Sequence, residues 1–220
     1  MNSLEARMVY DNAVKAFGAA FPNLNGKSIA EYCKLTQSTY RFEQPLVAGQ
    51  TLYQFPVLAN QQVFSNTEQR LNQQDSAVIA SVFIGVGLPA SSTDTAWIPI
   101  TYDDPANFGA NAVPLRGFWN GSNLSIAVNN DILMPNWDVF KHYNAPETQQ
   151  TAALGAGSPE NQLRGSFDGW YPMQPSIVLL GSKNNVLQIT LPVGLTSVST
   201  YSRAVIMLRC ITAQNSTVVS

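Results

Sequence analysis

The chain has 220 residues, of which 45% are hydrophobic and only 12% are charged, with a net charge of −2. Its length and apolar content suffice for one sizeable β-sandwich or two compact barrels, and they exclude a disordered chain. No Lys or Arg is followed directly by another, so a basic patch is not supported and we expect no specific nucleic-acid site.

Neutral amides take the place of charges, as in Asn60–Gln62, Asn72–Gln74 and Thr148–Thr151. An ordinary soluble domain is about a quarter charged. A surface that lies mostly against identical neighbours gains little from charge, because like charges meet and repel across symmetric contacts. The composition therefore favours a self-associating protein, with an amide-rich secreted β-domain as the alternative.

The N-terminal part predicts a helix. Tyr10, Val14, Phe17 and Phe21 recur at helical spacing and form one apolar face, with Asn2 and Glu5 as a capping pair. An apolar face on a terminal helix needs a partner, either the chain's own β-body or a neighbouring subunit. We assign these four residues as candidate subunit contacts.

A second short helix is predicted from Ser28 and Glu31, which have the spacing of a capping box, through Leu35. Residues 1–37 thus form an N-terminal helical arm. No basic segment followed by an apolar one opens the sequence, and no apolar stretch is long enough to cross a bilayer, so we expect synthesis in a cytosol without an anchor.

Residues 38–220 predict an all-β body, because the period changes to two and turn residues recur every ten to fifteen positions. The almost continuously apolar segment from Ser76 predicts a central strand covered on both faces. The expected strands are Thr39–Glu43, Thr51–Pro56, Ser76–Val86, Trp97–Thr101, Leu115–Trp119, Leu124–Val128, Ile132–Met134, Val139–Tyr143, Ser176–Leu180, Val186–Leu191 and Arg203–Ala213.

Turn residues separate these strands. Asn120-Gly121 predicts a hairpin between the strands on either side, and Asn129–Asp131 predicts a turn. The stretch from Ala145 to Asp168, rich in Gly and amides, predicts a long exposed loop that suits subunit contact.

Groups that could carry out catalysis are few. The sole histidine, His142, and the distant Cys33 and Cys210 match no metal-binding spacing, and the cysteines predict buried free thiols. Asp103 and Asp104 resemble turn residues more than a carboxylate pair for hydrolysis. We therefore expect no catalytic residue, no cofactor, no metal site and no enzymatic activity.

Four tryptophans, Trp97, Trp119, Trp137 and Trp170, are expected mainly as core or interface anchors. The alternative is a carbohydrate-binding face on which such rings stack.

Several segments resemble structural proteins of small tailless icosahedral bacteriophages of Bacteroidetes-type hosts. They lie between Phe64 and the end of the chain: Gln69–Ser76 before an apolar strand, Asn120–Ile126, Pro175–Ser182, Asn185–Pro192 and Ala204–Ile211.

The resemblance implies a jelly-roll capsid protein located in the virion and made in the host cytoplasm. Size favours one expanded roll, whereas the resemblance favours a compact double roll. The expected partners are copies of the chain, assembled as a trimer within the capsid lattice, and other virion proteins, with an internal membrane beneath the shell left open. The alternative function is a receptor- or glycan-binding spike or fibre module, and a hydrolase centred on Asp103 and Asp104 is a third.

Overall fold

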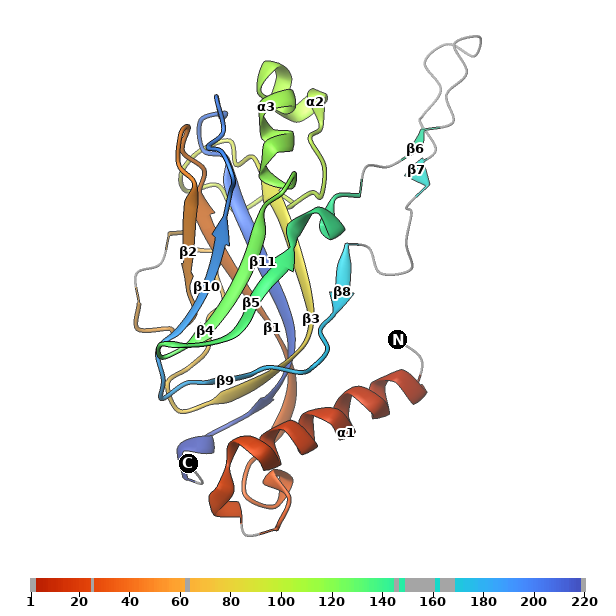
Figure 1. Ribbon diagram of the computed structural model, residues 1–220, viewed down its shortest axis with the longest axis vertical. Helices are drawn as coiled ribbons and strands as arrows, with labels where there is room; N and C mark the ends of the chain where they lie inside the picture. Colours follow the sequence, from red (N-terminus) through yellow and green to blue (C-terminus); the bar gives the residue numbers. More distant parts are fainter. Residues whose placement is uncertain are drawn as a thin grey trace.

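The computed structural model describes residues 3–24, 26–61, 64–144, 147–148, 161–162 and 169–218. Two antiparallel sheets make up most of the molecule, and one long helix lies at one end of it (Figure 1). The helices are α1 (Ser3–Ala20), α2 (Pro105–Phe108) and α3 (Ala112–Leu115), and the 3-10 helices are η1 (Pro22–Leu24), η2 (Ile29–Glu31), η3 (Gly109–Asn111), η4 (Arg116–Phe118), η5 (Val139–His142) and η7 (Ser216–Val218). The strands are β1 (Leu35–Pro45), β2 (Leu52–Pro56), β3 (Ser76–Gly87), β4 (Asn123–Val128), β5 (Asp131–Asp138), β6 (Glu147–Thr148), β7 (Asn161–Gln162), β8 (Trp170–Pro172), β9 (Val178–Leu180), β10 (Asn185–Thr190) and β11 (Arg203–Ala213).

The sheets pack face to face as a sandwich. The first has the order β1-β11-β3-β8, with β9 pairing with the same edge of β3 as a continuation of β8. The second has the order β2-β10-β4-β5, and β6 and β7 pair only with each other. The predicted all-β sandwich with an N-terminal helix is confirmed at this level.

The main core lies between the two sheets. Side chains alternate between buried and exposed along β2 and β10, so that Tyr53, Phe55 and Leu187 point inward. They meet Phe42 of β1 and Ile206 of β11 from the other sheet. β3 is almost entirely buried along its length, which confirms the prediction of a central strand covered on both faces.

Helix α1 covers part of the outer face of the first sheet. Phe17 and Phe21 pack against Val78 of β3 and against Ile211 and Ala213 of β11, forming a second, smaller core. The helix lies at the end of the sandwich opposite α2 and α3 (Figure 1). Phe17 and Phe21 of the predicted apolar stripe therefore find their partner within the same chain.

Three predicted strands are wrong. Leu115–Trp119 is helical, since it spans the end of α3 and η4, and Val139–Tyr143 contains η5, whose first turn is capped by the Asp138 side chain accepting from Phe140 N at 2.9 Å. Trp97–Thr101 forms only one bridge, between Ile100 and Val86. Apolar runs this short do not distinguish a strand from a helical turn by their pattern.

The turn predictions had mixed outcomes. Asn120-Gly121 is no hairpin, because a helical turn precedes it; Gly121 has φ +75° and leads from η4 into β4. Asn129, with φ +55°, instead turns the hairpin between β4 and β5. Ser28 and Glu31 form the predicted capping box, but on a single 3-10 turn, and Leu35 already belongs to β1. Asn2 and nearly all of the predicted 145–168 loop lie outside the described residues.

Candidate interaction surfaces

The four predicted contact residues, three in α1 and Phe21 directly after it, do not share one environment. Phe17 and Phe21 are buried in the chain's own second core, whereas Tyr10 is 40% exposed and Val14 is half-buried. Their role in subunit contact stays a prediction, and within it Tyr10 offers the largest free surface. A sequence pattern alone does not separate these cases, because the same stripe fits the chain's own sheet or a neighbour's.

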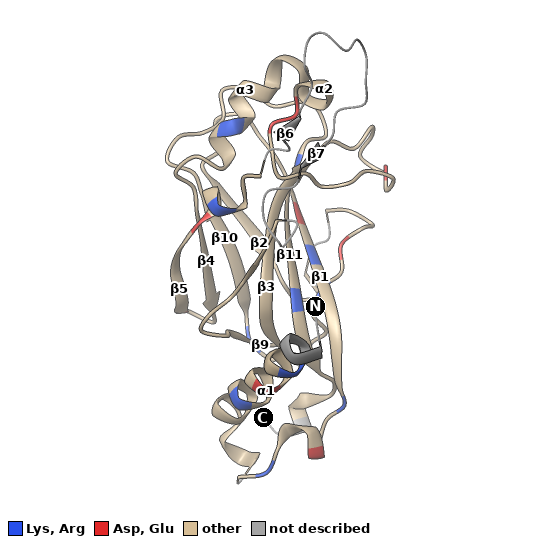
Figure 2. Ribbon diagram, turned by 90° about the vertical axis from the view of Figure 1, so that its right-hand side faces the viewer, with Lys and Arg blue, Asp and Glu red and all other residues tan. Residues whose placement is uncertain are grey.

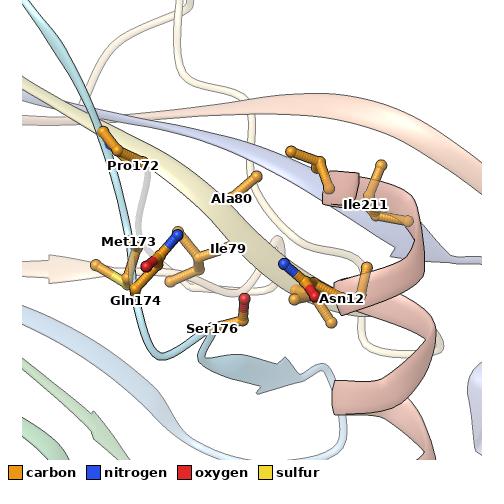
Figure 3. Close-up of a pocket in the computed structure, with 11 residues that line it drawn as sticks. Asn12, Ile79, Ala80, Pro172, Met173, Gln174, Ser176 and Ile211 are labelled. Atoms are coloured by element: carbon orange, nitrogen blue, oxygen red, sulfur yellow. The ribbon is translucent and has the colours of Figure 1, made fainter. Parts of the chain in front are cut away.

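A small groove lies between α1 and the first sheet (Figure 3). Its volume is about 70 Å³. Asn12 of α1 borders it on one side, and Gln174 and Ser176, in the link between β8 and β9, border it on the other; Ile79 and Ala80 of β3 lie between them. It has room for about two water molecules or one small side chain.

The outer face of the second sheet carries no ionisable group on three of its four strands. Outward side chains lie in rows across β2, β10 and β4, because the register places Gln54 and Ser125 on either side of Gln188. The Gln54 Nε2 donates to Gln188 Oε1 at 3.2 Å. We call this surface the uncharged face; its outward residues are Leu52, Gln54, Pro56, Asn123, Ser125, Ala127, Val186, Gln188 and Thr190.

The uncharged face is bare in the described part of the chain: no helix or strand lies over it (Figure 2). Charge enters at its margin, on β5, which begins with Asp131 and ends with Asp138; Asp138 lies opposite Asn123. The first sheet differs, because α1 packs on its outer side and Arg41, Arg203 and Arg209 project from it.

Apolar side chains gather at the end of the sandwich opposite α1. The segments 46–51, 109–121 and 191–202 meet there; Gly49 N donates to Leu195 O at 2.8 Å, and Asn111 Nδ2 donates to Ser199 Oγ at 3.1 Å. We call this region the loop end. Its exposed apolar residues are Val47, Val113, Val193 and Tyr201.

A buried ionic cluster lies on the first sheet. Glu43 is fully buried and contacts Arg41 Nε and Arg203 Nη1, each at 2.8 Å. Arg70 pairs with Glu68 at 2.9 Å, and both side chains are almost inaccessible. The ring of Trp97 covers the Arg41 guanidinium at 4.5 Å. These charges are withdrawn from water, so the surface is poorer in charge than the composition suggests.

Asp103 and Asp104 have separate structural partners. Asp103 is buried, pairs with Arg116 at 2.9 Å and accepts a hydrogen bond from the Tyr143 hydroxyl. Asp104 caps α2, accepting from Ala106 N at 3.0 Å. Because these contacts engage both carboxylates, the geometry gives the hydrolase alternative no support. Asp104 bonds the backbone of the residues that follow it, as predicted for an aspartate in a turn.

His142 is fully buried and joins β5 to β8. Its Nε2 accepts from Trp137 Nε1 at 2.9 Å, so its proton is on Nδ1, which donates to Gly169 O at 3.1 Å. Burial, with a smaller contribution from Lys141, lowers the pKa of His142 to about 4. We call Trp137, His142 and Gly169 the histidine clasp. The imidazole is neutral and has both nitrogens engaged, which marks a structural residue.

The two cysteine thiols and most of the tryptophan rings are buried. Cys33 and Cys210 are free thiols, as predicted, and burial raises the pKa of each. Trp97, Trp119 and Trp170 are buried and Trp137 is half-buried, in line with the expectation of core anchors.

Within the described ranges, no group of three or more His, Cys, Asp or Glu could hold a metal ion. None of the helices described is long and apolar enough to cross a membrane.

Neither protein-family models, curated proteins nor solved structures give a match to this chain.

Proposed function

We propose that the sandwich is one jelly roll and that the chain is a capsid subunit that assembles with copies of itself into an icosahedral phage shell. Strand order supports the fold. With β8 and β9 taken as two halves of one strand, the two sheets contain eight strands. The first pairs with the eighth, the second with the seventh, the third with the sixth and the fourth with the fifth. This pairing is the one expected when a chain wraps as a jelly roll, and it therefore supports the proposed fold. A double roll would need about sixteen strands, twice the number of a single roll.

The surface supports the capsid role. Charged side chains are few, and the Glu43 cluster and Asp103 are hidden, while the uncharged face and the loop end offer amides and aliphatic groups to a neighbour. Shell subunits meet many identical neighbours, and uncharged surfaces avoid repulsion at each contact. The observation that carries the proposal is the combination of this strand order with an uncharged outer sheet.

The proposal is tested by the mass and shape of the purified chain. Light scattering over a wide range of concentrations, combined with electron microscopy, is expected to give trimers or closed particles. A chain that stays monomeric at the highest concentration would refute the capsid role. Binding of that monomer to a glycan array would instead support the spike or fibre alternative.

A further inference from the structure

The uncharged face stands apart from the rest of the molecular surface. The segments 46–61 and 184–202, which supply β2, β10 and their loops, contain no Asp, Glu, Lys or Arg, and neither does β4. About a quarter of an ordinary soluble domain is charged. A bare sheet face without any ionisable side chain is suited to a position in which it does not face bulk water.

We propose that the uncharged face is the contact surface for a second copy of this chain, joined face to face about a two-fold axis. This inference rests on the proposed self-assembly and specifies one of its contacts.

Electrostatics select the occupant. In a two-fold contact, charged groups near the axis would meet their own copies, like charge against like charge, whereas this face carries no charge to oppose. A strongly charged partner would find no counter-ion on it and would lose hydration without compensation. A second copy of the same neutral face avoids both penalties.

Hydrogen bonding also favours a second copy. Each amide of the row formed by Gln54 and Gln188 has donors and an acceptor, and their mutual bond of 3.2 Å uses only part of this capacity. An amide can both donate to and accept from an identical amide. On either side of this row lie the smaller or apolar groups of Val186 and Thr190, which allow two faces to approach closely.

The dimensions predict a weak contact. Three strands about 4.8 Å apart and about 20 Å long present roughly 300 Å² of flat area, whereas a stable interface buries about 800 Å² on each partner. A single pair of faces is therefore a transient dimer. Repetition in a closed shell makes such contacts effective together.

Opposite charges at Gln188 test this arrangement. Gln188 lies at the centre of the uncharged face, so a two-fold axis through that centre brings the two copies of residue 188 together. In Q188K and Q188E like charges then meet, and we expect each variant to associate at least about tenfold more weakly than the parent in low salt. An equal mixture of the two variants pairs Lys with Glu, and we expect association to return to the parent level or exceed it. Sedimentation equilibrium measures the association, and circular dichroism with thermal melting verifies the fold.

Thr39 supplies the matched control. It is exposed on β1, on the outer side of the other sheet. T39K and T39E are expected to associate like the parent. If the Gln188 variants also match the parent, or if mixing them gives no recovery, the proposed contact is wrong.

The yield of particles separates this inference from the capsid proposal. If the parent forms particles and Q188K forms them in equal yield, the face contact is overturned and the capsid role stands. Recovery on mixing without any particle would support the contact and count against the capsid role. A parent that never associates would overturn both.

Discussion

The histidine clasp makes the stability of the fold depend on pH between about 5 and 7, above the ordinary pKa of Asp and Glu and below that of Cys, Tyr and Lys. His142 is the sole histidine, and its pKa falls from 6.5 to about 4 on folding. The unfolded chain therefore binds one more proton than the folded chain between these values. The contribution of the neutral His142 to the free energy of unfolding is present above about pH 6.5 and is lost as the pH falls toward 4.

The magnitude follows from the two pKa values. At pH 5 the unfolded imidazole is almost fully charged, while the folded one is still mostly neutral. With about 1.4 kcal/mol per pKa unit, the free energy of unfolding is expected to be about 2 kcal/mol lower at pH 5 than at pH 7. The main cause of the lowered pKa is burial of the imidazole. The geometry adds a second cost of protonation, because a protonated Nε2 cannot accept the indole hydrogen of Trp137.

Urea unfolding at pH 7, 6 and 5 measures this loss, and NMR follows the single imidazole directly. The variant H142Q cannot titrate and is expected to show a much flatter profile over the same interval. An imidazole that titrates near pH 6.5 in the folded protein would refute the reasoning. So would equal pH profiles for the parent and H142Q.

Three substitutions test other parts of the fold by chemical unfolding. F17A removes the centre of the α1 core and is expected to cost about 3–5 kcal/mol, whereas Y10A on the exposed side should cost little; equal costs would contradict the assigned packing. E43Q leaves Arg203 without its counter-charge and is expected to cost about 3–5 kcal/mol; a neutral result would show that water reaches the cluster. G87A places a methyl group 1.9 Å from the Trp97 ring and is expected to cost about 1–3 kcal/mol with a red shift of tryptophan fluorescence; unchanged fluorescence would place the ring elsewhere.

Long periodic segments were predictable from the sequence. Arg203–Ala213 has the predicted bounds, and the strand from Ser76 differs by one residue at its end, because extended apolar runs bounded by turn residues leave few alternatives. The helical stripe ending at Phe21 was equally clear. These three segments form the two central strands of the first sheet and the helix that covers them.

Short segments and the surface were less predictable. Leu115–Trp119 has the composition of a strand, but the chain before it is already helical from Ala112 onward. The Glu43 cluster gave no sequence signal, since Arg41, Glu68 and Arg203 come together only through strand pairing and loop closure. The sequence shows that β2, β4 and β10 contain no charged residue. Only the strand pairing shows that these three strands are neighbours and form one uncharged face.

The histidine clasp fixes Gly169, and Thr101 fixes Asn144, so both residues that flank positions 145–168 are anchored to the described part of the fold. Asn144 exchanges hydrogen bonds with Thr101 at 3.1 and 3.0 Å, and Gly169 is held by His142. Both attachment points thus belong to the rigid framework, and the entropy of closing a segment between fixed ends rises only slowly with its length. A foreign peptide spliced between Asn144 and Gly169 would start and finish on the same scaffold, which makes this position a natural choice for displaying an antigen.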